Sequence, residues 1–296
     1  MKLSFWTLGM PPEWSNEDFA DNAVKYGYDG IDLRCTRPDE NGKPSDLGNL
    51  CILSPDVEEV GNLFRSKGIE IASMLCYNSG GHGKDAGSWD DFQEEIAKHA
   101  VVGQRLGAER IRVTIPKMPE GQVMETYLEQ IGHNVAVALD STPGMKAIFE
   151  NHVGAASALQ LLQMCETVGD DRLGVFFSPD HSIVMQEDSV ELCDLYSKYI
   201  HQVCFADRKL MLDDLGRFDG QFYYLRYESC GNGEGNVPAR RIFDKLKEKG
   251  WDGYVSLKWE KSARFGHHLP MGDTELPRFI DFMKSVGVES STAAAR

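Results

Sequence analysis

The stretch WDGYVSLKWE (residues 251–260) carries the pattern of a buried strand with two charged residues at its far end. Successive side chains on a strand point to opposite faces. Lys258 and Glu260, two positions apart, are therefore expected to point the same way, while Leu257 and Trp259 flank them. This pattern predicts charged groups held at the mouth of a sheet or barrel.

The same stretch begins with a junction that recurs along the chain, in which a helix ends at or beside a glycine and a strand follows. Glycine adopts the left-handed conformation that closes many helices. The junctions read YGYDGIDLR (26–34), SKGIEIASML (66–75), RLGAERIRVTI (105–115) and KEKGWDGYVSLKW (247–259). A repeated helix-to-strand junction favours an α/β fold.

Alternating strands and helices fill the chain between these junctions. Strands are predicted near residues 2–8, 30–34, 69–76, 110–115, 145–150, 173–178, 200–206 and 253–259. Helices are predicted near residues 16–26, 55–67, 89–106, 121–139, 155–168, 188–199, 238–249 and 274–285. Eight strands each followed by a helix predict a single (β/α)8 TIM barrel over residues 1–286, with a flexible tail at 287–296.

Composition limits the classes of function. A formal charge of −15 over 296 residues disfavours binding to a nucleic-acid backbone, which needs a basic surface. No apolar run is long enough to span a membrane, and the first residues lack a secretory signal, so a cytoplasmic protein is expected. Seven cysteines without a C-x-x-C pair indicate reduced thiols. Two long connections, 34–54 and 207–238, suggest lids or contacts of a homo-oligomer.

In a TIM barrel the active site lies at the carboxyl ends of the strands, so the last residues of each predicted strand are the candidates. They are Trp6, Arg34, Tyr77, Asn78, Arg112, Glu150, Asn151, His152, Ser178, Asp180, His181, Gln202, Cys204, Asp207, Lys258 and Glu260. Acidic, imidazole, amide and thiol groups gather on the second half of the barrel. This clustering is a stronger indication of a site than any single residue.

Several of these segments, in this order, resemble the sugar phosphate isomerase/epimerase superfamily of xylose isomerase-like TIM barrels. They are GYDGIDLR, RLGAERIRV, the IFENH that ends the fifth strand, the SPDH of the sixth, and GEGNVP followed by GWDGYVSLKWE. The resemblance runs from about residue 2 to 285 and names no particular substrate. It implies an enzyme for a small sugar, in which a divalent metal polarises a carbonyl while a base moves a proton on the adjacent carbon.

The resemblance also implies four metal ligands at the ends of strands five to eight, and only Glu150 matches. Ser178, Cys204 and Lys258 stand where the family has an aspartate, a histidine and a glutamate. A lysine ammonium among the ligands would repel a divalent cation. Three interpretations follow. In the first, strand alternation continues past Glu150, Ser178 and Lys258, so that His152, Asp180 and Glu260 point inward nearer the mouth, where Glu150, Asp180 and Glu260 hold a displaced metal (Mn, Mg, Zn or Co). In the second, the site has no metal, and Lys258 supplies the positive charge or forms a Schiff base. In the third, the barrel binds a sugar without catalysis.

The predicted catalytic residues are Glu150, His181 and Lys258. A second group is expected to bind the substrate: Arg34, Tyr77, His152, Asp207 and Arg208. The predicted function is a sugar or keto-sugar isomerase or epimerase that abstracts a proton next to a carbonyl. A keto-sugar lyase or dehydratase, which begins with the same step, is the alternative.

Overall fold

The computed structural model describes residues 1–36, 50–52, 56–77, 87–211, 227–259 and 270–290. Its strands are β1 (Lys2–Phe5), β2 (Gly30–Thr36), β3 (Leu50–Cys51), β4 (Glu70–Cys76), β5 (Arg110–Val113), β6 (Lys146–Glu150), β7 (Leu173–Phe177), β8 (Ile200–Phe205), β9 (Asp207–Leu210), β10 (Tyr227–Cys230) and β11 (Tyr254–Leu257). Its helices are α1 (Asn16–Tyr26), α2 (Val57–Ser66), α3 (Trp89–Leu106), α4 (Met124–Leu139), α5 (Ala158–Val168), α6 (Pro179–Val184), α7 (Ser189–Tyr196), the 3₁₀ turn η1 (Ser197–Tyr199), α8 (Ala239–Glu248) and α9 (Gly272–Ser285).

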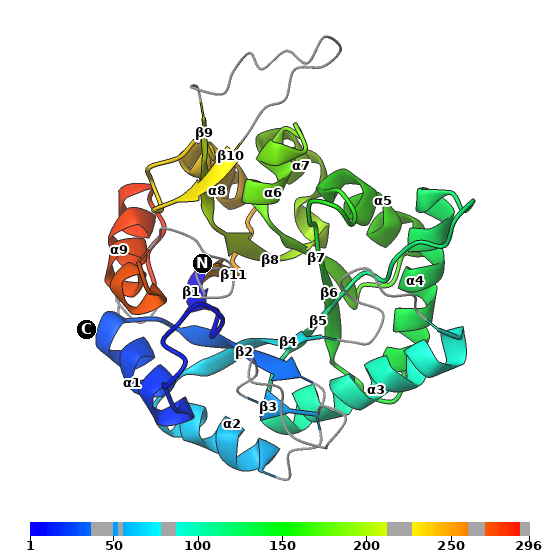
Figure 1. Cartoon of the computed structure of the whole chain (residues 1–296), viewed down its shortest axis with the longest axis horizontal. Coiled ribbons are helices and arrows are strands. Elements are labelled where there is room, and N and C mark those ends of the chain that lie inside the picture. Colours follow the sequence, from blue (N-terminus) through cyan, green and yellow to red (C-terminus); the bar gives the residue numbers. More distant parts are fainter. Residues whose placement is uncertain (37–49, 53–55, 78–86, 212–226, 260–269, 291–296) are drawn as a thin grey trace.

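The parallel strands form a barrel with the helices around it, which confirms the predicted (β/α)8 fold (Figure 1). Neighbouring strands follow the order β1-β11-β8-β7-β6-β5-β4-β2, and the two-residue β3 extends the edge of β2. A bridge between Trp6 and Asp32 joins β1 to β2. The Thr7 backbone N–H, which donates to the Asp32 carbonyl at 3.2 Å, strengthens this closure.

The helix boundaries follow the capping residues in the sequence. Ser15 forms a capping box with Asp18 at the start of α1, and Gly27 ends that helix with φ +80°. Gly107 ends α3 in the same way, with φ +88°. These left-handed glycines turn the chain from the outer ring into the next strand, as the repeated junctions predict.

Four local expectations differ from the structure. The sixth strand ends at Phe177, and Pro179 then starts the short helix α6, which the sequence reading missed. Asp180 and His181 therefore lie on a helix instead of continuing the strand. The fifth strand ends at Glu150, as predicted, but the chain does not continue in an extended conformation beyond it, and His152 lies in the turn that follows.

The other two differences concern segments expected to be irregular. Part of the long connection after β8 is a hairpin, in which β9 pairs with β10 in antiparallel register. The tail expected from residue 287 is packed at least through Ser290, because Val288 and Ser290 are buried. The Ser290 hydroxyl donates to Asp29 at 3.1 Å.

The barrel lumen is filled in tiers. A polar floor surrounds Asp32, whose carboxylate accepts from Ser4 (2.8 Å), Ser73 (2.6 Å) and Gln202 (2.7 Å). Because β2 and β8 are not neighbours, the bond from Gln202 crosses the lumen. Above the floor lies an apolar layer made of Trp6, Leu75, Ile148, Phe176 and Cys204. The mouth of the barrel lies beyond this layer and contains the charged residues.

Gly61 on α2 packs tightly against the end of α3. A Cβ at Gly61 would lie 2.1 Å from the carbonyl oxygen of Leu106, which is backbone and cannot swing aside. We expect Gly61→Ala to lower the free energy of unfolding by about 1–3 kcal/mol, although alanine favours helix formation. Urea denaturation measures the change. Glu59→Ala, an exposed substitution on the same helix, should stay within about 0.5 kcal/mol of the parent. A free energy of unfolding that is unchanged in Gly61→Ala would show that α2 and α3 can move apart with little loss of stability.

Candidate active site

Lys258 lies at the centre of the charged cluster at the barrel mouth. It directly follows β11, and its backbone N–H donates to the Phe205 carbonyl at 2.8 Å, which joins it to β8. Its side chain is 0% exposed. The Lys258 Nζ lies 2.8 Å from Glu150 Oε1, 2.6 Å from His181 Nε2 and 3.5 Å from Ser178 Oγ. The structure thus brings together the three residues predicted to be catalytic.

Glu150, the last residue of β6, is held between two cations. Its Oε1 accepts from Lys258, and its Oε2 lies 2.7 Å from Arg112 Nη2 on β5. Burial alone would raise the pKa of Glu150, but the charges of Lys258 and Arg112 outweigh it and hold this pKa well below its ordinary value. Glu150 is therefore ionised at neutral pH.

The short helix α6 supplies the other side of the cluster. Asp180 accepts from the Ser178 hydroxyl at 2.6 Å and from Arg208 Nε at 3.0 Å. Burial would raise the pKa of Asp180, but nearby positive charge, mainly that of Lys258, lowers it below its ordinary value. Burial followed by the charge of Lys258 lowers the pKa of His181 to about 3. His181 is thus neutral, and its Nε2 accepts from the ammonium.

Two residues that position the site were candidates at strand ends to which the sequence assigned no role. Arg112 ion-pairs with Glu150, as described above. The Asn151 side chain accepts from the Ser178 N–H at 2.7 Å and donates to the Ser178 carbonyl at 2.9 Å and to Ser182 Oγ at 3.2 Å. It thereby ties the end of β6 to the start of α6. Their position at the ends of predicted strands was the only signal in the sequence.

Arg34 and Tyr77 lie together at the mouth, as expected of substrate-binding residues. The Arg34 guanidinium lies 4.1 Å from the centre of the Tyr77 ring, and Arg112 lies 5.2 Å from the same ring. Arg112 is also 5.7 Å from the ring of Trp6. Guanidinium groups are attracted to aromatic faces at these distances. The result is a cationic and aromatic rim next to Glu150.

Asp207 has a different environment from the one predicted. Its carboxylate accepts four backbone N–H groups, from Arg208 (2.9 Å), Gly233 (3.0 Å), Gly235 (2.9 Å) and Val237 (3.1 Å). These contacts fasten the 231–237 segment to the start of β9. Burial raises the pKa of Asp207 in spite of the backbone donors. This geometry favours a structural role, whereas Arg208 contacts Asp180 within the cluster.

The described donor set does not fit a divalent metal at the position that the resemblance implies. The ammonium of Lys258 stands beside Glu150, and Arg112 covers the other oxygen. Asp180 is engaged by Ser178 and Arg208. Within the described ranges no group of three or more His, Cys, Asp or Glu side chains could hold a metal ion. Glu260, required for the displaced site, lies outside the described residues, so that site stays a prediction.

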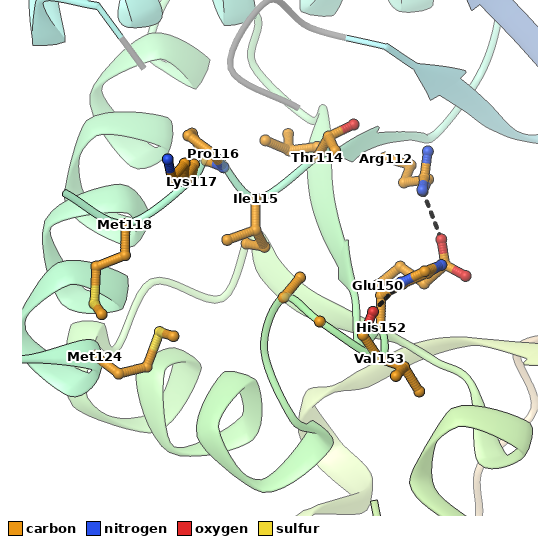
Figure 2. Close-up of a pocket in the computed structure, with 13 residues that line it drawn as sticks. Arg112, Thr114, Ile115, Pro116, Lys117, Met118, Met124, Glu150, His152 and Val153 are labelled. Carbon is orange, nitrogen blue, oxygen red and sulfur yellow. Dashed lines mark hydrogen bonds and ion pairs between the residues drawn. The ribbon is translucent and has the colours of Figure 1, made fainter. Parts of the chain in front are cut away.

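A pocket of about 560 Å³ opens beside Glu150, between the loops that follow β5 and β6. Figure 2 shows Arg112 and Glu150 at one side, His152 and Val153 near them, and Met118 and Met124 at the opposite side. The pocket thus has a charged end that belongs to the cluster and an apolar end. Such an arrangement can orient a small molecule whose polar part faces Glu150.

Comparison with solved structures gives matches over nearly the whole chain. The IolI protein with a bound zinc atom has a TM-score of 0.71 at 15% identity, covering 97% of this chain and 99% of that one. A sugar phosphate isomerase/epimerase from Parabacteroides distasonis has 0.67 at 16%, covering 97% and 94%. The D-psicose 3-epimerase from Clostridium cellulolyticum, with D-tagatose, has 0.68 at 13%, covering 97% and 100%. At these identities the matches show the shared fold.

The sequence comparisons differ in outcome. No curated protein sequence gives a significant match. Among the described residues, no helix has the length and apolar character needed to cross a membrane. The family model for the xylose isomerase-like TIM barrel matches residues 20–286, and the chain therefore belongs to that family.

Proposed function

We propose that this protein is a sugar or keto-sugar isomerase or epimerase that uses the Lys258 ammonium to polarise the substrate carbonyl. The observation that carries this proposal is the position of Lys258 Nζ, which is buried 2.8 Å from Glu150 and 2.6 Å from His181 at the barrel mouth. Membership in the xylose isomerase-like family supports the reaction type. The printed descriptions of two fold relatives, an isomerase/epimerase and a ketose epimerase, support a sugar substrate.

In this mechanism the substrate carbonyl oxygen accepts a hydrogen bond from Lys258. Removal of a proton from the adjacent carbon sends the electron pair toward that oxygen, which becomes an enolate. A preorganised positive charge stabilises an enolate far better in a buried site than in water. Glu150 keeps Lys258 charged, and Glu150 and neutral His181 both accept from the ammonium and orient it. Lys258 thus supplies charge stabilisation without a metal.

The same intermediate explains why isomerisation, epimerisation and elimination all remain open to this site. Delivery of the proton to the former carbonyl carbon, with transfer of the adjacent hydroxyl proton to the enolate oxygen, gives isomerisation. Protonation of the original carbon on its opposite face gives epimerisation. Loss of a hydroxyl from the next carbon gives elimination. The fate of the enolate depends on the substrate, so the common first step is the one to test.

We expect Lys258→Met to slow hydrogen exchange at the carbon next to the carbonyl by about 10²–10³-fold, as removal of an oxyanion donor does in other enzymes. The probes are D-fructose, D-psicose and D-tagatose in D₂O, followed by proton NMR. Lys198→Met, at an exposed lysine, is the matched control and should exchange like the parent. Exchange by Lys258→Met at the parental rate would contradict the proposal. Reductive trapping of a probe on Lys258 by borohydride would replace it with a Schiff-base mechanism.

We expect the purified protein to contain substoichiometric Mn, Mg, Zn and Co, and EDTA to leave hydrogen exchange unchanged. The physical reason is that Lys258 and Arg112 already neutralise Glu150, so a divalent ion would meet net repulsion there. Inductively coupled plasma mass spectrometry measures the metal content. One tightly bound ion per chain, needed to restore exchange after chelation, would instead support the displaced site with Glu260.

Neutral His181 makes stability depend on pH. In the unfolded chain a histidine takes up a proton near pH 6.5, whereas His181 in the folded chain does so only near pH 3. Between these values the unfolded state binds more protons, so the free energy of unfolding falls as the pH is lowered, by up to about 1.4 kcal/mol per pH unit from this group. His181→Gln should flatten this slope in urea denaturation between pH 6.5 and 4.5. His133→Gln, at an exposed position, should keep it, and an equal slope in both variants would refute the assignment.

A further inference from the structure

We propose that His152 is the base that removes and returns the substrate proton, with Nε2 as the accepting atom. This inference rests on the proposed function and names a group that the mechanism above leaves open. His152 lies in the turn after β6 and lines the pocket next to Glu150 (Figure 2). Its imidazole ring centre lies 4.1 Å from that of His181.

Glu150 is poorly suited to take the proton itself. One of its oxygens accepts from Lys258 at 2.8 Å, and the other lies 2.7 Å from Arg112 Nη2. Both interactions stabilise the ionised form, and protonation would weaken them. A carboxylate held this firmly as an anion has little tendency to accept a proton at neutral pH.

His181 and Asp180 are also committed to other contacts. An ammonium can only donate, so the 2.6 Å contact with Lys258 Nζ uses the lone pair of His181 Nε2. Asp180 accepts from the Ser178 hydroxyl and from Arg208. His181 positions Lys258, and Asp180 positions α6. Either residue would have to break a strong interaction before it could accept a proton from a substrate in the pocket.

The hydrogen bond that His152 makes uses Nδ1 and leaves the lone pair on Nε2. Its Nδ1 lies 2.8 Å from the Val153 carbonyl oxygen, which can only accept, so Nδ1 carries the hydrogen. A neutral imidazole with Nδ1–H keeps its lone pair on Nε2. The turn that carries it is fixed by two backbone bonds, His152 N–H to Ala156 at 3.0 Å and Ala155 N–H to the His152 carbonyl at 2.9 Å. The tautomer and the position of the ring are therefore both set before a substrate binds.

The proposed step balances in protons and electrons. The C–H bond next to the carbonyl breaks, the proton moves to His152 Nε2, and imidazolium forms. The electron pair of that bond forms the carbon–carbon double bond of the enolate, whose oxygen faces Lys258. Delivery of that proton to the former carbonyl carbon, with transfer of the hydroxyl proton on the deprotonated carbon to the enolate oxygen, forms the new carbonyl and completes an isomerisation. Because His152 is only half-buried, its proton can exchange with solvent before delivery.

The first experiment needs no substrate. In ¹⁵N NMR of the labelled protein, with His152→Gln used for assignment, we expect His152 to be the Nδ1–H tautomer. Diethyl pyrocarbonate at neutral pH should acylate His152 and spare His181, which is 2% exposed. An Nε2–H tautomer, or a His152 that resists acylation, would overturn the inference because the lone pair would then be absent or inaccessible.

The second experiment compares His152→Gln and His152→Asn with His133→Gln in the D₂O exchange assay with D-fructose, D-psicose and D-tagatose. Both substitutions at position 152 should lower kcat for exchange by about 10²–10⁴-fold, the usual contribution of a general base, with KM nearly unchanged. A merely structural His152 would instead lower the melting temperature and change KM and kcat together.

The outcomes separate this inference from the proposed function. If Lys258→Met loses exchange while His152→Gln retains it, His152 is not the base and the ammonium mechanism stands. If His152→Gln loses exchange and Lys258→Met retains it, the base assignment is supported and the role of Lys258 is refuted. If the parent protein exchanges none of the three probes, the result counts against both.

Discussion

The arrangement of side chains at the barrel mouth depends on one carboxylate that lies between two buried cations. Glu150 ends β6, Arg112 belongs to β5 and Lys258 follows β11. The two contacts of Glu150 therefore require these three strands to reach the same level along the barrel axis. Each of these charges would be costly to bury alone, and the loss of one partner would leave the others uncompensated. The Asn151 side chain bonds the backbone of Ser178 and so fixes the position of α6 relative to this cluster. The cluster therefore fixes the orientation of Lys258 within narrow limits.

The sequence predicted the fold well because its signals are local. Serines that start helices and glycines such as Gly27 and Gly107 that end them act within a few residues. The meeting of Glu150, His181 and Lys258 followed from a general rule, since the carboxyl ends of all strands meet at one face of a barrel. Neither result needed knowledge of distant contacts.

The sequence could not predict the conformation of the residues that directly follow each strand. The assumption that alternation continues past Glu150 and Phe177 placed His152 and Asp180 in an extended segment. A turn and a proline-initiated helix replace that segment and bring His152 and His181 together. Asp207 illustrates a related point: a carboxylate after a strand can bind a substrate or the backbone of a loop, and only the fold reveals the four N–H groups that converge on it.

The polar floor around Asp32 bears on how this family diversifies. Its bonds tie β2 to β1, β4 and, across the lumen, β8, and they lie below an apolar layer that separates them from the mouth. Closure of the barrel is thus secured at one end, while the charged cluster occupies the other. A chain built this way can change the side chains at its mouth without losing its scaffold. The division of the lumen lets those side chains change independently of the architecture that carries them.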